Sequence, residues 1–142
     1  MTSSVLRLIA VNLLAVALAC AMNTRYERAT CQPLKRGRSA DTTVYDTTQV
    51  TNRPVIFGGP PPRYPDAPRN AGIQGRVVVS VIIGQDGRAE KNSILVLEHL
   101  DPSIDRAAID YVTHTIFQPG CLVGLPVRTR VQIPIEYKVR SL

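Results

Sequence analysis

The side chains that could bind a metal or a cofactor are few in this sequence, and their spacing does not bring them together. The two histidines are His99 and His114, and Cys121 is the other residue of a metal-ligating type near them. Zinc sites are typically marked by paired ligands in C-x-x-C or H-x-x-x-H spacing, and neither pattern occurs here. We therefore expect neither a metal site nor a cofactor.

The residues that serve as nucleophiles or as general acids and bases also lack supporting neighbours. Ser80 and Ser93 fall in predicted strands with no base motif beside them. Three aspartates fall in one predicted helix, where they suit a helix cap and solvated charges: Asp101, Asp105 and Asp110. The Gly-Gln-Asp-Gly segment at 84–87 is typical of a turn rather than a phosphate loop, because no helix follows it directly. These patterns predict that the protein is not an enzyme.

The chain carries a modest excess of positive charge. Its net charge of +6 arises from 17 Lys and Arg against 11 Asp and Glu in 142 residues. Such an excess suits an anionic membrane surface or an acidic partner. A nucleic-acid partner is not expected, because neither a basic helix nor a pattern of base-stacking aromatic residues accompanies the charge.

The first residues are typical of an export signal. Arg7 precedes an apolar run over residues 8–22 that is interrupted only by Asn12 and ends in small residues. A membrane-spanning helix needs about 20 apolar residues, so the run is short for that role. Its composition and length fit a signal for secretion.

Three outcomes are open at the end of this signal. Cys20 in the segment Ala-Leu-Ala-Cys could be lipidated and become the mature N-terminus, or cleavage at an Ala-x-Ala site could release a soluble protein. In the third outcome the segment stays uncleaved as a short anchor. We favour lipidation, so residues 1–21 are predicted to be a lipoprotein-type export signal with Cys20 as the lipid anchor.

The cysteine count agrees with export. With Cys20 lipidated or removed, Cys31 and Cys121 remain as an even pair in an oxidising compartment. A disulfide that closes so long a loop could contribute roughly 4–5 kcal/mol in the chain-entropy model. We predict this disulfide.

Composition divides the rest of the chain into an arm and a domain. Residues 22–57 are polar and aperiodic, which predicts a linker or loosely draped arm. The segment Phe-Gly-Gly-Pro-Pro-Pro-Arg-Tyr-Pro then interrupts any regular element, so we place the folded domain at 58–142.

The domain has the element order of a small α+β fold. Its predicted elements are a short helix within 65–72, strands at 75–83 and 88–99 joined by the turn at 84–87, a helix after Asp101 and a last strand at 127–139. Asp101 can cap the longer helix, and Pro102 suits its first position. This order predicts a three-stranded antiparallel sheet with two helices packed on one face.

The last strand has the clearest two-residue alternation in the sequence, and it contains Pro134. Proline cannot donate a hydrogen bond to a neighbouring strand, so it places this strand at a sheet edge, at least on the side where the donor would point. An exposed edge strand accepts an extended peptide by β-augmentation, in which backbone hydrogen bonds give affinity.

The order of these motifs resembles the C-terminal domain of TonB, the periplasmic energy transducer of Gram-negative bacteria. The segments that carry the resemblance are PPRYP (61–65), AGIQGRVVVSVIIGQDGR (71–88), LDPSIDRAAIDYV (100–112), FQPG (117–120) and GLPVRTRVQIPIEY (124–137). They cover nearly all of residues 58–139, and their order is more specific than any one of them.

The resemblance implies a binding mode. Domains of this family bind the TonB box, a short peptide of outer-membrane receptors, as a strand beside their last strand, near the Tyr-Pro segment. Carried over by position, the expected partner-binding residues are Arg63, Tyr64, Pro65, Arg128, Arg130, Val131, Gln132 and Ile133. Tyr64 is as well explained by packing as by recognition. The same edge could also pair with itself in a homodimer.

Two functions follow as expectations. The first is an envelope module that pairs with an extended segment of an outer-membrane receptor or transporter, in TonB-dependent transport. The alternative is a structural or cell-wall-associated lipoprotein that keeps the fold without energy transduction. Either protein would lie in the periplasm, anchored to the outer membrane more readily than to the inner one, because the spacer before the domain is short.

Overall fold

The computed structural model describes residues 31–33 and 42–139, and the export signal with Cys20 lies outside them. The elements in chain order are β1 (Val44–Asp46), β2 (Val55–Gly58), α2 (Asp66–Asn70), β3 (Gly75–Ile83), the 3-10 helix η2 (Lys91–Ser93), β4 (Leu95–Glu98), α3 (Pro102–His114), β5 (Ile116–Gln118), β6 (Gly120–Leu122) and β7 (Leu125–Tyr137). Within the described ranges, no helix has the length and apolar character needed to cross a membrane.

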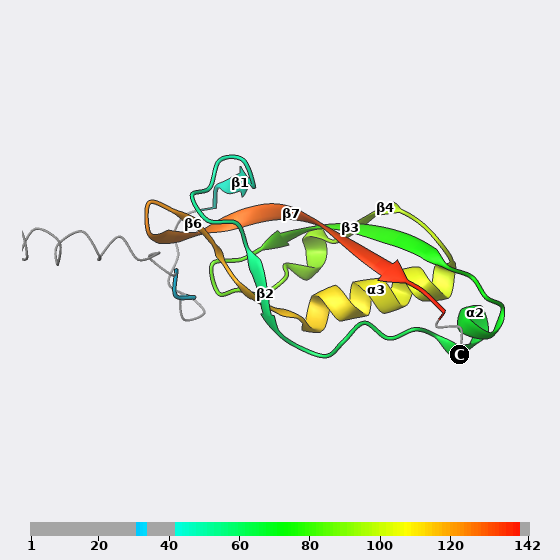
Figure 1. Ribbon diagram of the computed structural model, residues 1–142. Coiled ribbons are helices and arrows are strands. Elements are labelled where there is room, and N and C mark those ends of the chain that lie inside the picture. Colours follow the sequence, from blue (N-terminus) through cyan, green and yellow to red (C-terminus); the bar gives the residue numbers. More distant parts are fainter. Residues whose placement is uncertain (1–30, 34–41, 140–142) are drawn as a thin grey trace, which may run out of the picture. The chain divides into compact units, whose positions relative to one another are not determined.

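The two long strands β3 and β7 form the centre of the main sheet (Figure 1). They pair antiparallel without a register shift, from Gly75 opposite Tyr137 to Ile83 opposite Thr129. β4 pairs antiparallel with the other side of β3. The ladder between β3 and β7 therefore fixes the orientation of both strands along their shared length.

The core forms where the alternating strands face the amphipathic helix α3. Val77, Val79, Val81 and Ile83 of β3 are all fully buried, as are Ile104, Ala108 and Val112 of α3. Since side chains alternate across a strand, these four residues of β3 share one face, and Ser80 and Ile82 on the other face are buried as well. The predicted apolar faces of the strand at 75–83 and of the longer helix are thus confirmed.

The start of α3 and the glycine after α2 are as the sequence predicts. Asp101 caps α3 by accepting hydrogen bonds from the backbone N–H groups of Ser103 (2.9 Å) and Ile104 (3.3 Å). The hydrogen bonds from Ser103 hold the pKa of the Asp101 carboxyl below its usual value. α2 is followed by Gly72, whose φ of 68° is the left-handed conformation that glycine adopts readily. α2 lies at the end of the sheet where β3 begins, while α3 lies along one face (Figure 1).

The α+β class is confirmed, but the expectation of a three-stranded antiparallel sheet is wrong. β1 adds to β7 in parallel, β6 pairs with the start of β7, and β2 and β5 form a separate two-stranded sheet. β1 and β2 belong to the segment at 22–57 that we expected to be a loose arm. Strands of three or four residues give too little periodicity for a sequence pattern to reveal them.

Candidate partner-binding edge

The hydrogen bonds of Ile82 show which backbone groups of β7 point away from β3. The Ile82 N–H donates to the Ser93 hydroxyl (2.8 Å), and the Ile82 carbonyl accepts from the Glu90 N–H (2.9 Å). Ile82 therefore turns both groups away from β7. Arg130, which lies opposite Ile82, must likewise turn its N–H and C=O away from β3.

This alternation extends along the whole strand, because the register between β3 and β7 has no shift. The even-numbered residues from 128 to 136 direct their backbone groups to the outer side of β7, and the odd-numbered residues bond to β3. Pro134 belongs to the outward set, so its missing N–H leaves a gap at the outer side and costs the central ladder nothing. Gln132 and Glu136 supply the outward donors of the second half.

The outer side of β7 is covered over residues 128–130 and open in the second half of the strand. β1 pairs with residues 128–130 on this side. β6 pairs with residues 125–127, and it lies on the same side as β3, because Cys121 bonds to Asn52 and leaves Leu125 and Val127 to bond to β6. Among the described strands, none pairs with residues 131–137 on this side. We call residues 131–137 on this side the open edge. The last strand is thus an open edge strand on this side over residues 131–137, whereas β1 covers Arg128 and Arg130.

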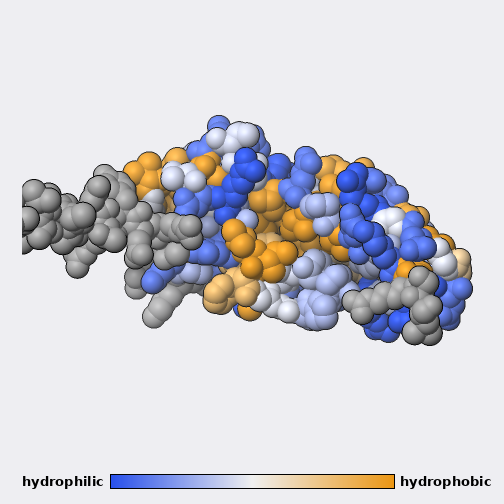
Figure 2. Space-filling model, in the orientation of Figure 1, coloured by the Kyte–Doolittle hydropathy of each residue, from blue (hydrophilic) through white to orange (hydrophobic). Residues whose placement is uncertain are grey.

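A groove of about 800 Å³ lies beside the open edge. Residues 130–134 of β7 form one side of it, and the others are lined by Asp46, Thr47, Arg53, Pro54, Val55, Ile56 and Phe117. Val55 and Ile56 keep 59% and 51% of their surface exposed, so this side is apolar and accessible. Figure 2 shows apolar surface gathered in the region of β2. An unpaired strand edge and an apolar surface therefore face the same space.

Two cationic side chains border this groove. Arg53 and Arg130 are both exposed, and Asp46 supplies one opposing charge. Long charged side chains at the rim of an apolar groove can cover apolar surface with their stems while their ends stay in water. The groove can therefore accept an extended segment with apolar side chains and tolerate or favour acidic ones.

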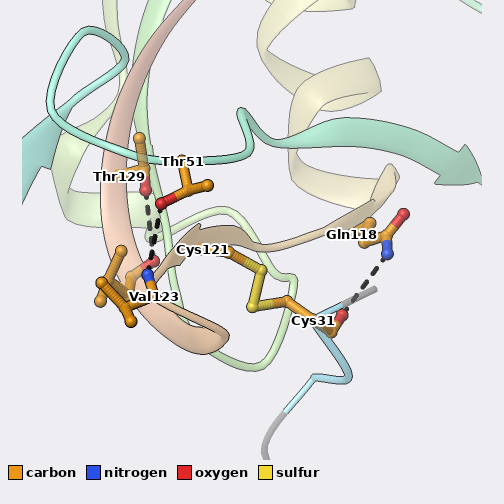
Figure 3. Close-up of a disulfide and its surroundings, with 7 residues drawn as sticks. Cys31, Thr51, Gln118, Cys121, Val123 and Thr129 are labelled. Atoms are coloured by element: carbon orange, nitrogen blue, oxygen red, sulfur yellow. Dashed lines mark hydrogen bonds between the residues drawn. A yellow bond between two sulfur atoms is a disulfide. The ribbon is translucent and has the colours of Figure 1, made fainter. Parts of the chain in front are cut away.

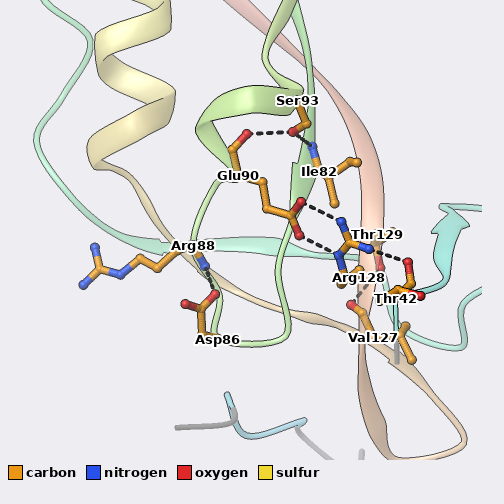
Figure 4. A network of polar contacts seen from close by, with 9 residues as sticks. All are labelled: Thr42, Ile82, Asp86, Arg88, Glu90, Ser93, Val127, Arg128 and Thr129. Atoms are coloured by element: carbon orange, nitrogen blue, oxygen red, sulfur yellow. Dashed lines mark hydrogen bonds and ion pairs between the residues drawn. The ribbon is translucent and has the colours of Figure 1, made fainter. Parts of the chain in front are cut away.

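Arg128, by contrast, is half-buried and is held by hydrogen bonds within the protein (Figure 4). Its guanidinium makes two hydrogen bonds of 2.7 Å to the Glu90 carboxylate and a third to the carbonyl oxygen of Thr42. A bidentate pair of this kind fixes geometry as well as charge. Arg128 therefore connects β7 to the segment after β3 and to the start of β1, and it does not line the groove.

The Tyr-Pro segment packs at the other end of β7. The Tyr64 hydroxyl donates to the Ile73 carbonyl, and its ring meets the ring of Tyr137 edge-on with centroids 5.3 Å apart. Tyr64 therefore joins α2 to the end of the sheet. Arg63 is exposed and Pro65 precedes α2, and neither lines the groove beside the open edge.

Three side chains at the end of β7 have shifted pKa values, namely Glu136, Tyr137 and Lys138. Burial, then the charges of Asp105 and Tyr111, raise the pKa of Tyr137, whose buried hydroxyl has no hydrogen-bond partner among the described residues. The Lys138 ammonium lowers the pKa of Glu136, and Glu136 in turn raises the pKa of Lys138. The two residues of this exposed ion pair do not line the groove beside the open edge.

A disulfide ties the start of the described chain to β6 (Figure 3). Cys31 and Cys121 are bonded, with Cα atoms 5.8 Å apart, and both are buried. Cys121 lies in β6 and also exchanges backbone hydrogen bonds with Asn52. The start of the described chain is thus tied to the strand that pairs with the first residues of β7.

The structure brings together only part of the predicted set of partner-binding residues. Arg130, Val131, Gln132 and Ile133 line the groove, whereas Arg128, Arg63, Tyr64 and Pro65 serve elsewhere or lie apart. Sequence reasoning missed the residues contributed by the arm, chiefly Asp46, Arg53, Val55 and Ile56. A signal for the last two was present, because Val55, Ile56 and Phe57 form an apolar run in a polar segment.

Three comparisons with known proteins agree with this fold. A family model described as the C-terminal part of the Gram-negative bacterial TonB protein matches residues 60–139. Protein TonB of Vibrio cholerae serotype O1 is 29% identical over 99 residues, and the match covers 65% of this chain and 40% of that protein. Protein TonB of Xanthomonas campestris pv. campestris strain B100 is 30% identical over 77 residues, covering 54% and 34%.

A solved structure is similar as well. The solution structure of the Pseudomonas aeruginosa TonB CTD aligns with a TM-score of 0.53 and 28% identity, over 63% of this chain and 89% of that one. The matches span 40% or less of the length of the two TonB proteins, so the comparison concerns their shared domain. Because the family model matches more than half of the chain, the protein belongs to the TonB C-terminal family.

Proposed function

We propose that this protein is an envelope interaction module that binds an extended segment of an outer-membrane receptor or transporter, in TonB-dependent transport. The observation that carries the proposal is the open edge of β7 beside an apolar groove. A strand added there gains backbone hydrogen bonds from β7 and buries apolar side chains against β2. Membership of the TonB family supports the class of partner.

The direction of the backbone groups gives a sharp test. Gln132→Pro removes an outward donor of the open edge and leaves the bonds to β3 in place, whereas Gln132→Ala keeps that donor. The probes are synthetic peptides from the periplasm-facing segments of outer-membrane receptors of the same bacterium. Binding is followed by the amide NMR signals of Gln132 and Glu136 in the wild-type chain and by titration calorimetry in the variants.

We expect Gln132→Pro to weaken binding about tenfold or more. The lost hydrogen bond and the proline ring in place of the N–H together cost about 1.4 kcal/mol of binding free energy. Gln132→Ala should bind like the wild type. If Gln132→Pro binds every peptide as well as Gln132→Ala does, strand addition at the open edge is wrong.

We also propose that lipidation of Cys20 anchors the protein in the envelope, on the outer membrane. The sequence of the segment 1–22 supports this anchor, and its position lies outside the described residues. The intact mass of the protein from the membrane fraction tests it. A chain that begins at a diacylated Cys20 supports the proposal, and one that retains residues 1–19 contradicts it.

A further inference from the structure

We propose that β1 is an intramolecular strand that occupies part of the partner-binding edge, and that a partner must displace it to pair with residues 128–130. The inference rests on the proposed function, because it concerns the same side of β7. It goes beyond the family match, which begins at residue 60 and so does not include β1.

β1 pairs with β7 as an added strand would. Val44, Tyr45 and Asp46 lie opposite Arg128, Thr129 and Arg130 in parallel register. In a parallel pair, the residue opposite an inward-facing one directs both backbone groups at its neighbours, so Tyr45 bonds toward Arg128 and Arg130. The groups of Asp46 point away, as its N–H donates to the Gln49 side chain (2.7 Å) and its carbonyl accepts from the Gln49 N–H (3.0 Å).

β1 also borders the open edge. Its last pair is Asp46 opposite Arg130, and residue 131 begins the part of β7 that no described strand covers on this side. Asp46 and the next residue, Thr47, line the groove. A partner strand in the groove that extended past residue 131 toward the start of β7 would meet β1, and two strands cannot pair with the same backbone groups.

The attachment of β1 favours reversible occupation. The ladder between β1 and β7 covers only three residue pairs, so a short ladder must break to release β1. Its start is held by the Arg128 guanidinium, which donates to the carbonyl of Thr42 while Glu90 fixes the arginine.

The segments before and after β1 are both attached to Cys121, and this attachment keeps β1 near β7 after release. Cys31 is bonded to the Cys121 side chain, and the N–H groups of Thr51 and Asn52 donate to the Cys121 carbonyl (2.7 and 3.2 Å). The segment that carries β1 therefore starts and ends at β6. Such closure gives β1 a high effective concentration at its site, so it competes with a partner without binding tightly.

The variant that tests the proposal is Tyr45→Pro, which removes the N–H that faces β7. Val44→Pro is the matched control, because the N–H of Val44 faces away from β7 and an edge strand tolerates proline there. Tyr45→Ala separates loss of the ring from loss of the N–H. The first readout is hydrogen exchange of the Arg130 amide, which faces β1. The second is affinity for the receptor peptides used above.

We expect Tyr45→Pro to accelerate exchange of the Arg130 amide and to raise peptide affinity between about three- and tenfold. This gain follows when a competing state that is occupied about 70–90% of the time is removed. The bound peptide should then also shift the Arg130 amide signal. Val44→Pro and Tyr45→Ala should stay close to the wild type in both readouts.

The failures are distinguishable. If peptides bind and their affinity is the same in Tyr45→Pro and Val44→Pro, displacement of β1 is wrong and strand addition stands. If the Arg130 amide exchanges equally slowly in both proline variants, β1 is not held as we infer. If no receptor peptide binds either form, a synthetic peptide of residues 42–50 probes the edge directly. Its binding to Tyr45→Pro alone supports β1 as a displaceable strand and rejects the receptor partner, and its failure to bind overturns the inference.

Discussion

The first half of β7, residues 125–130, and its second half, residues 131–137, share one alternating sequence pattern but differ in their neighbours. In the first half, residues 125–127 pair with β6, residues 128–130 pair with β1, and the ladder with β3 begins at Thr129. The second half has β3 on one side and a groove on the other. The comparison shows that the part of a strand that stays an open edge is set by what its own chain leaves uncovered.

The charged residues of the two halves differ in the same way. Arg128 is paired with Glu90 and bonded to Thr42, while Arg130 is exposed at the groove. The two arginines are two residues apart and lie on the same face of the strand. Their different roles follow from the segments that pass beside them.

The largest expected effect comes from opening the disulfide between Cys31 and Cys121, which closes the segment that carries β1. We expect a Cys31→Ser, Cys121→Ser double variant to lose up to about 4 kcal/mol of unfolding free energy, by the loop-entropy model. Denaturant unfolding of the oxidised wild type and of the variant measures this loss. Exchange of the Arg130 amide should also accelerate, because the segment that carries β1 is no longer closed. An unchanged free energy of unfolding would show that this disulfide does not stabilise the fold.

The next effect contrasts the inner and outer sides of β7. Val131→Pro removes an N–H that bonds to β3 and leaves a buried carbonyl unpaired, so we expect a loss of about 2 kcal/mol or more. Gln132→Pro should lose much less, because its N–H faces the groove. Thermal unfolding of both variants compares them, and equal destabilisation would contradict the assigned direction of the backbone groups.

A smaller effect separates the two arginines. Arg128→Ala should cost about 1 kcal/mol, since it removes a bidentate pair that is partly exposed to solvent. Arg130→Ala should change stability by less than about 0.5 kcal/mol, as is usual for exposed positions. Urea titrations of the two variants give the difference, and a larger loss for Arg130→Ala would reverse the comparison.

Filling the gap at the open edge should have a modest effect on binding. Pro134→Ala restores an outward donor between those of Gln132 and Glu136. We expect an affinity gain of about fivefold for a receptor peptide, the value of one ordinary hydrogen bond. Sedimentation of the free protein is the necessary companion measurement, because the same donor also favours edge-to-edge dimers. A variant that neither binds more tightly nor self-associates would show that this position is not part of the edge.

The smallest effect concerns Tyr137, the last residue of β7. Tyr137→Phe removes a buried hydroxyl that has no partner among the described residues. The favourable removal of a buried hydroxyl without a hydrogen bond offsets the packing contacts that are lost with its oxygen atom. The free energy of unfolding should therefore be unchanged or rise by up to about 1 kcal/mol. Calorimetric unfolding decides the point, and a clear loss would imply a partner for this hydroxyl.

Sequence alone determined the local elements of the domain. The alternation of β3 and β7 specified which side chains are buried, and Asp101 with Pro102 specified where α3 begins. Pro134 indicated that one side of the last strand does not bond to a neighbour at that point. These signals are readable because they depend on residues close together in the chain and on periods repeated over nine or more residues.

Only the tertiary structure decided where the edge is open. The strand that covers residues 128–130 on the outer side, β1, has three residues and comes from a segment about 80 residues before β7 in the chain. Its pairing with β7 and the attachment of its segment to Cys121 are long-range contacts without a local pattern. The groove, the roles of Arg128 and Arg130 and the packing of Tyr64 follow from that arrangement, because each is set by which distant segment comes to lie beside it.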